Sequence, residues 1–273
     1  MAYRRILTIQ DISCLGQCSM TVALPILSAC GHEVCILPAA LLSTHTGGFT
    51  NPAIMNLSER MDAIWCHWKR EGISFDAIYT GYLGSEGAVE TAERIMDELL
   101  APGGKIIVDP AMADHGKLYR GLSESYAKAI ERLCLRADVM LPNITEAALM
   151  TGMAYQEEIN EEYILQLLEK LGGNEVVLTG AALKPGMTGA AIRCNGEVSF
   201  YLHEKLDCSY SGTGDMFASA FTGAYLQNKN LAEAVKIAAD YTSLSVRNTY
   251  ENPAHRYGVK FETALGDLIE MLK

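Results

Sequence analysis

Short apolar runs alternate along the chain with longer stretches in which apolar residues recur every three or four positions. The short runs have the length and composition of buried strands, and they lie at 5–10, 33–37, 77–80, 105–108, 138–141 and 175–179. The longer stretches have helical spacing, and they lie at 19–29, 55–70, 86–100, 123–135, 162–171, 231–246 and 261–272. This alternation predicts a mostly parallel sheet with helices on both faces.

Two segments depart from the alternation. Residues 190–194 and 197–202 flank Asn195-Gly196, a pair typical of the tight turn in a β-hairpin. Residues 41–49 are polar and rich in glycine, which predicts a short flap beside the sheet. Because no linker-like stretch interrupts the chain, we expect residues 1–273 to form one domain, a three-layer α/β/α sandwich around a mostly parallel sheet.

The charge of the chain limits its partners. A formal net charge of -11 argues against nucleic acid and anionic membranes, because both bind clustered Lys and Arg. A nucleotide stays compatible, since backbone dipoles and metal ions can bind its phosphates. The eight cysteines are scattered without a Cys-x-x-Cys pair, and no apolar stretch has the length of a membrane span. We therefore expect a cytoplasmic protein with neither a zinc site nor disulfides.

The stretch Ser211-Gly212-Thr213-Gly214-Asp215 precedes a run of small residues that looks like a closely packed helix. Two glycines free the backbone for a tight turn, and the first amides of the helix would be available to an anion such as a phosphoryl group. Asp215 could then accept a proton from an attacking hydroxyl. The alternative is structural: Asp215 is only an N-cap and the glycines only a turn.

Two more polar motifs follow predicted strands directly. Asp109 comes after the strand at 105–108, and Asn143 and Glu146 come after the strand at 138–141. Since ligands of such sheets lie beyond the carboxyl ends of the strands, these motifs would share one rim with Asp215. Phosphoryl transfer needs this convergence of carboxylates, Mg²⁺ and an aligned nucleophile. The structural alternative is that Asp109 ends a strand and that Asn143 and Glu146 form a capping box.

The order of the motifs resembles the ribokinase superfamily and, within it, the pyridoxal/pyridoxamine kinases. The motifs are Gly81-Tyr82-Leu83-Gly84-Ser85, Asp109-Pro110, Asn143-x-x-Glu146 and Gly212-Thr213-Gly214-Asp215. The last two are typical of the superfamily, whereas Thr8-Ile9-Gln10, Thr44 and Gly-Tyr-Leu-Gly-Ser are typical of the vitamin kinases. The resemblance covers nearly the whole chain. It implies a ribokinase-like homodimer that uses ATP and Mg²⁺ to phosphorylate the 5′-hydroxymethyl group of a B6 vitamer in salvage, and it leaves dependence on a monovalent cation open.

The resemblance also implies roles for individual residues. Asp215 would be the catalytic base, and the amides of Gly212, Thr213 and Gly214 would stabilise the phosphoryl group. Mg²⁺ would be held by Asp109 and Glu146. The nucleotide and its metal would lie near Asp109, Asn143, Glu146, Thr179, Gly180, His203, Glu204, Lys205 and Leu206. The ring of the vitamer would lie near Asp11, Thr44, His45, Tyr82 and Asp215.

The residues expected around the ring carry open alternatives. Tyr82 is either a stacking partner of the ring or a packing residue of the rim, and His45 is either a ligand or a solvent-exposed residue of the flap. Asp11 stands where pyridoxal kinases commonly carry Ser. We hypothesise that Asp11 pairs with a cationic aminomethyl group, which would favour pyridoxamine over pyridoxal.

Two rival functions fit the same fold. A hydroxymethylpyrimidine kinase would share the anion site and differ in its ring contacts. A non-catalytic vitamin or nucleotide binding protein would need no base beside an anion site, so the intact Asp215 motif argues against it.

Overall fold

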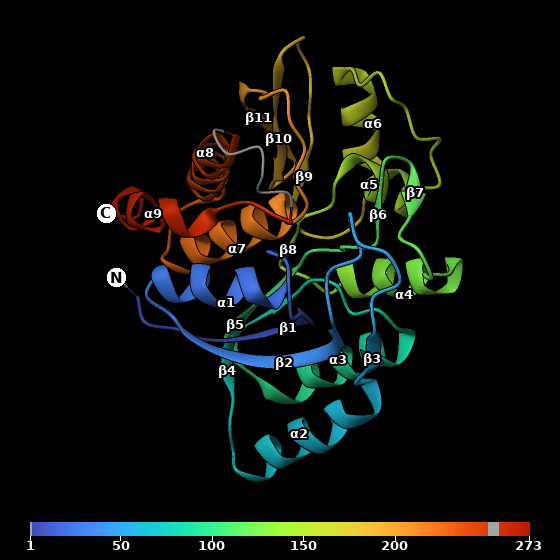
Figure 1. The fold of residues 1–273 in the computed structure, drawn as a ribbon, viewed down its shortest axis with the longest axis vertical. Coiled ribbons are helices and arrows are strands. Elements are labelled where there is room, and N and C mark those ends of the chain that lie inside the picture. The colour runs from blue at the N-terminus through green and yellow to red at the C-terminus, as the bar shows by residue number, and fades with distance from the viewer. Residues whose placement is uncertain (1, 251–256) are drawn as a thin grey trace.

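The computed structural model describes residues 2–250 and 257–273, and within them a nine-stranded sheet runs in the order β11-β10-β9-β8-β5-β4-β1-β2-β3 (Figure 1). The strands are β1 (Arg5–Ser13), β2 (Glu33–Leu42), β3 (Ile54–Asn56), β4 (Phe75–Thr80), β5 (Leu100–Val108), β8 (Val139–Met140), β9 (Glu175–Thr179), β10 (Met187–Cys194) and β11 (Glu197–Glu204). From β2 to β9 every pairing is parallel, whereas β3, β10 and β11 are added antiparallel at the two edges.

Helices cover both faces of this sheet. They are α1 (Met20–Ala29), α2 (Ser58–Arg70), α3 (Glu86–Leu99), α4 (Glu124–Cys134), α5 (Ile144–Thr151), α6 (Glu161–Lys170), α7 (Thr213–Leu226), α8 (Leu231–Tyr250), the short 3₁₀ helix η1 (Phe261–Ala264) and α9 (Leu265–Met271). None of the helices within the described ranges has the combination of length and apolar character that crossing a bilayer requires.

The apolar residues form one core on each face of the sheet. Successive side chains of a strand point to opposite faces, so Ile106 packs with α2 to α6 while the next residue, Ile107, packs with α1, α7 and α8. Figure 1 shows these two sets of helices on opposite sides of the sheet. The expected three-layer α/β/α architecture with a mostly parallel sheet is confirmed.

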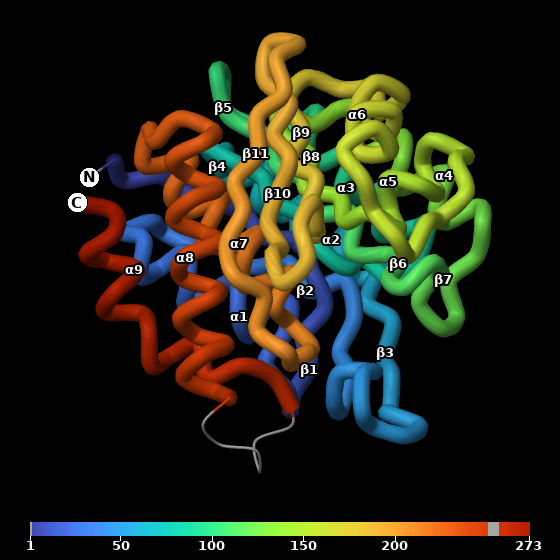
Figure 2. The backbone as a smooth tube through the Cα atoms, turned by 90° about the horizontal axis from the view of Figure 1, so that it is seen from above, coloured from blue at the N-terminus to red at the C-terminus, as the bar shows by residue number. Residues whose placement is uncertain are grey.

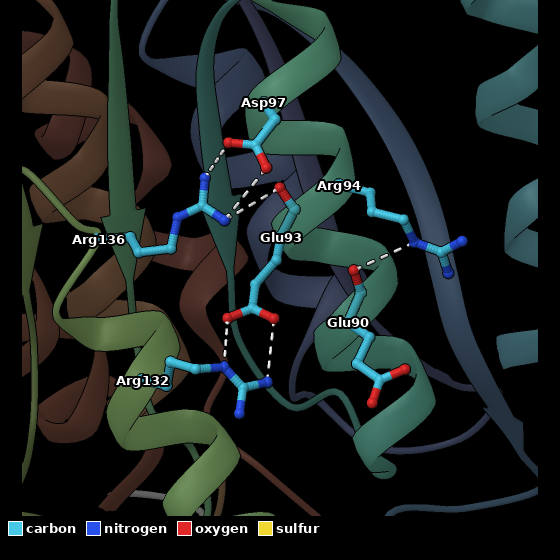
Figure 3. Close-up of polar contacts among 6 residues, drawn as sticks. All are labelled: Glu90, Glu93, Arg94, Asp97, Arg132 and Arg136. Atoms are coloured by element: carbon cyan, nitrogen blue, oxygen red, sulfur yellow. Dashed lines mark hydrogen bonds and ion pairs between the residues drawn. The ribbon is translucent and has the colours of Figure 1, made fainter.

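Ion pairs tie two neighbouring helices of one layer together (Figure 3). The guanidinium of Arg132 in α4 donates to both carboxylate oxygens of Glu93 in α3, at 2.8 and 3.0 Å, and Arg136 contacts Asp97 one turn further along α3. Paired geometry of this kind is the favourable form of an ion pair near the surface. These contacts join α3 to the end of α4 and its following turn, and they have a structural role.

A small hairpin, β6 (Ala113–Asp114) and β7 (Lys117–Leu118), lies outside the main sheet. It is fixed to the start of α5, because Met112 donates its amide to Glu146 Oε1 at 2.9 Å and Gly116 donates to Thr145 Oγ1 at 3.0 Å. The sequence pattern did not predict this hairpin, since strands of two residues are too short to show a period.

The predicted flap and its neighbours needed correction. β2 continues to Leu42, so the irregular flap begins only after it. The helix expected at 55–70 begins at Ser58, because residues Ile54–Asn56 pair with β2 as the edge strand β3. The hairpin around Asn195-Gly196 is confirmed, and both residues have the positive φ that its tight turn requires, 52° and 83°.

Candidate active site

A cleft of about 1140 Å³ opens at the edge where the parallel strands end. Nearly all residues that the sequence placed at the site line this cleft: Asp11, His45, Tyr82, Asp109, Asn143, Glu146, Thr179, Gly180, His203, Glu204, Lys205, Leu206, Gly212, Thr213, Gly214 and Asp215. Thr44 is the exception. It is not among the residues that line the cleft, and its hydroxyl is buried without a hydrogen-bond partner among the described residues.

The start of α7 forms the floor of the anion site. Gly212 is the N-cap with φ 84°, and a Cβ there would lie 2.0 Å from the carbonyl oxygen of Gln17. Only glycine fits this position, both sterically and in backbone conformation. The amides of Thr213, Gly214 and Asp215 have no acceptor among the described residues. These amides, together with the helix dipole, can bind an anion.

Asp215 lies in the first turn of α7, three residues after the N-cap, so the structural alternative that it is the N-cap itself is wrong. Burial raises the pKa of its carboxyl to about 7, the charge of Asp11 adds to this rise, and a hydrogen bond from the Ser19 backbone opposes it. A carboxylate whose pKa lies near neutral pH is suited to general base catalysis.

Asp109 and Glu146 bring two more buried carboxylates to the cleft. Burial raises the pKa of Asp109 well above its usual range, and the negative charges of Glu146 and Asp215 raise it further. Burial also raises the pKa of Glu146, to about 7, although three backbone amides bonded to it oppose the rise. A positive charge bound among these carboxyls would stabilise their ionised forms.

Asn143 and Glu146 also form the capping box of α5. Glu146 donates its amide to Asn143 Oδ1 at 2.9 Å, and Asn143 donates its amide to Glu146 Oε2 at 2.8 Å. The structural alternative for this pair is therefore confirmed. It does not remove the pair from the site, because both residues line the cleft as well.

The donor set fits Mg²⁺ bound together with phosphates. Within the described residues, no three His, Cys, Asp or Glu side chains are placed to hold a metal ion by themselves. Mg²⁺ usually keeps several waters and binds through one or two carboxylates plus substrate phosphates. Asp109 and Glu146 match that requirement, since both are buried carboxyls that line the cleft, and a bound cation would favour their charged forms.

Asp11 also lines the cleft, with only 3% of its surface exposed. The register between β1 and β2 shifts between Gln10 and Ile12, so Asp11 leaves the regular ladder at this point. Its amide donates to the carbonyl of Tyr82 at 3.0 Å, and Ser13 Oγ donates to its carboxylate at 3.1 Å. Burial raises the pKa of Asp11, while hydrogen bonds from the side chains of Ser19 and Ser13 oppose the rise.

His45 is a buried residue of the flap and not the solvent-exposed one that the sequence left open. Its ring packs edge-on against Phe49, with centroids 5.1 Å apart, and Nδ1 accepts the amide of Gly47 at 3.1 Å. Burial lowers the pKa of the imidazole, so the neutral ring is favoured. Together with Tyr82, these rings give part of the cleft an aromatic lining.

Several lining residues escaped the sequence analysis. They are Ser13, Cys18, Ser19, Phe49, Tyr119, Arg120, Thr188, Tyr210, Phe217, Ala239, Thr242, Ser243 and Val246. Ser19 has φ 49° although it is not glycine, an outlier that no sequence motif signals. The last four lie on one face of α8. In the sequence, their small side chains indicate only that this face is packed, not that it lines a cleft.

Comparisons with known proteins identify relatives of this chain. Residues 51–259 match the model of the phosphomethylpyrimidine kinase family. Pyridoxal kinase from Arabidopsis thaliana is 26% identical over 261 residues, which cover 91% of this chain and 83% of the relative. The structure of pyridoxal kinase from Lactobacillus plantarum superposes with a TM-score of 0.90 at 32% identity, covering 98% of this chain and 97% of the other.

A second solved structure is a protein from Bacteroides thetaiotaomicron assigned to the phosphomethylpyrimidine kinases, in a crystal form with pyridoxal. It superposes with a TM-score of 0.90 at 31% identity, covering 97% of this chain and 95% of the other. The similarity to these structures extends over the whole sheet and both helical layers.

Proposed function

The chain belongs to the phosphomethylpyrimidine kinase family, and from this premise we propose that it transfers the terminal phosphoryl group of ATP to the 5′-hydroxymethyl group of a B6 vitamer. The observation that carries the proposal is the position of Asp215. This carboxylate, with a pKa near 7, adjoins the unused amides at the start of α7 and shares one cleft with Asp109 and Glu146. The names of the relatives support a vitamin substrate of this kind.

The reaction follows from this arrangement. Asp215 takes the proton of the substrate hydroxyl while the hydroxyl oxygen attacks the γ-phosphorus. The amides of Thr213 and Gly214 stabilise the charge on the phosphoryl oxygens as the bond to ADP breaks. Mg²⁺ held near Asp109 and Glu146 would supply neutralisation of the phosphate charge. Thr179, Gly180 and the residues 203–206, which line the same cleft, would border the nucleotide.

ADP release by the purified protein tests the function. We expect release that depends on a vitamer when pyridoxine, pyridoxal or pyridoxamine is added with ATP and Mg²⁺. Faster release with hydroxymethylpyrimidine would favour the alternative function, a hydroxymethylpyrimidine kinase. The name of the matching family is consistent with that alternative. Binding of a vitamer without any ADP release would instead indicate a binding protein and contradict the proposal.

The activity should depend on pH through Asp215. Because the pKa of this carboxyl is raised to about 7, the base is protonated and inactive below that pH. We expect kcat/KM to rise about tenfold per pH unit up to about pH 7 and then to level off. The measurement is kcat/KM for the vitamer from pH 5.5 to 9, and a flat profile across pH 7 would contradict the role of Asp215.

Asp11 should set the preference among vitamers. Its buried carboxylate lines the cleft beside Tyr82, where it can pair with the cationic aminomethyl group of pyridoxamine. We expect Asp11→Ser to lower the ratio of kcat/KM for pyridoxamine over pyridoxal by about tenfold or more, since a charge-assisted hydrogen bond is lost. Asp11→Asn is the matched control for side-chain shape, and an unchanged ratio in Asp11→Ser would rule the pairing out.

A further inference from the structure

The charges that line the cleft are strongly unbalanced. Among the described lining residues, six are acidic: Asp11, Asp109, Asp114, Glu146, Glu204 and Asp215. Of the Lys and Arg side chains of the described residues, two line it: Arg120 and Lys205. A nucleoside triphosphate brings further negative charge into this space. Each of the two cations in the lining therefore offsets a large share of that negative charge.

Arg120 and Lys205 lie on separate parts of the cleft. Figure 2 shows the hairpin β6–β7, which Arg120 follows, on one side of β8 and β9, and the hairpin β10–β11, which Lys205 follows, on the other. Lys205 is fixed on its side by its amide, which donates to the carbonyl of Gly186 at 2.8 Å. The two cations can therefore serve different parts of one extended anion.

The backbone beside Arg120 is tied to the carboxylate end of the cleft. The neighbouring Tyr119 donates its amide to the carbonyl of Met112 at 2.8 Å, and Met112 donates its own amide to Glu146 at 2.9 Å. Burial raises the pKa of the Tyr119 phenol, and the nearby charges of Glu146, Asp109 and Asp215 raise it further. Arg120 thus starts from a fixed point next to the carboxylates that surround the reaction.

The side chain of Arg120 is exposed and makes no hydrogen bond or ion pair with any described residue. An arginine with a structural role usually has such a partner, as Arg132 in α4 and Arg136 just after α4 have. The planar guanidinium matches the oxygens of a phosphoryl group with two parallel hydrogen bonds, which a lysine ammonium does not.

Resting on the kinase function proposed above, we propose that Arg120 binds the γ-phosphoryl group of ATP during its transfer. As the proton passes to Asp215, the bond from the 5′-oxygen to phosphorus forms and the bond from phosphorus to the ADP oxygen breaks. Arg120 stabilises the charge on the oxygens of the moving group, opposite the amides of α7. The transferred group leaves with the vitamer 5′-phosphate and ADP lacks it, so Arg120 should contribute little to the binding of ADP alone.

The test compares Arg120→Gln with Lys117→Gln, a matched loss of one positive charge three residues away, in strand β7. Lys117 is exposed on β7 and does not line the cleft. We expect Arg120→Gln to lower kcat by about 30-fold or more and to leave the Kd for ADP within about threefold of wild type. Lys117→Gln should change kcat by less than about twofold, as is usual for a surface substitution away from the site.

Chemical rescue provides a readout that a structural role would not give. Guanidinium ion added at millimolar concentration should restore part of the kcat of Arg120→Ala and should not affect Lys117→Ala. An unchanged kcat in Arg120→Gln, an equal fall in Lys117→Gln, or a rise in the Kd for ADP that parallels the whole loss would overturn the proposal. If the wild-type protein itself releases no ADP with any vitamer, the proposed function fails first, and this outcome is distinct from the others.

Discussion

Asp215→Asn is expected to lower kcat by about 10³-fold while the Kd for ADP stays within about threefold of wild type. Asn keeps the shape of the side chain but cannot accept the proton of the substrate hydroxyl. The amides of Thr213 and Gly214 are untouched, so the anion site should still bind phosphate groups. The measurements are kcat with saturating vitamer and ATP, and ADP binding by calorimetry.

The control for this substitution is Asp207→Asn, which removes the same charge from an exposed residue outside the lining of the cleft. It should leave kcat near the wild-type value.

Because the pKa of Asp215 is raised in the folded protein, the stability linked to this group is present at low pH and is lost as the pH rises through 7. Asp215→Asn should therefore be at least as stable as wild type at pH 8, and activity above about a tenth of wild type would contradict the role of a base.

Gly212→Ala should damage both the fold and the reaction. The added Cβ would lie 2.0 Å from the carbonyl oxygen of Gln17, and the φ of 84° is unfavourable for alanine. The start of α7 must shift, which displaces the amides of the anion site. We expect a loss of roughly 2 kcal/mol in the free energy of unfolding and a fall in kcat of about 100-fold, since misplaced donors stabilise the transition state poorly.

Gly196→Ala separates the two effects of that substitution. Gly196 has φ 83° in the turn between β10 and β11, but no heavy atom lies within 4 Å of the position that its Cβ would take. The Gly196→Ala variant should lose stability through backbone strain alone and keep the kcat of the wild type. If Gly212→Ala retains full activity in folded protein, the amides at the start of α7 do not form the anion site. Unfolding curves in urea and kcat for both variants decide this.

Motifs at the ends of parallel strands could be placed from sequence. Asp109 and Glu146 are 37 residues apart along the chain, yet both lie in one cleft, because β5 and β8 are adjacent parallel strands that end at the same edge of the sheet. The Asn143 capping box was also visible, since its two residues are local in sequence and its geometry is fixed by the helix start.

The flap shows where sequence reasoning ends. Its glycines indicate an irregular segment, but an irregular backbone has no period from which the direction of a side chain follows. Thr44 was expected at the ring but is not among the lining residues of the cleft, whereas His45, one residue later, is buried in that lining. Which of two neighbours faces inward depends on contacts such as the packing of His45 on Phe49, which form only in the folded protein.

Residues brought to the cleft by tertiary packing were equally hidden. Thr242 and Val246 lie on a helix whose pattern indicates burial without saying what it is buried against. Arg120 follows a hairpin with strands of two residues, and that hairpin is placed by hydrogen bonds to Glu146 and Thr145. The missed part of the site is therefore the part that long-range contacts create.

A crystal structure with a non-hydrolysable ATP analogue, Mg²⁺ and pyridoxamine tests the central claim most directly. Our account predicts the 5′-hydroxyl oxygen within hydrogen-bond distance of the Asp215 carboxylate, with the γ-phosphate against the amides that begin α7. A vitamer whose hydroxymethyl group lies away from Asp215, or a γ-phosphate bound away from those amides, would contradict it.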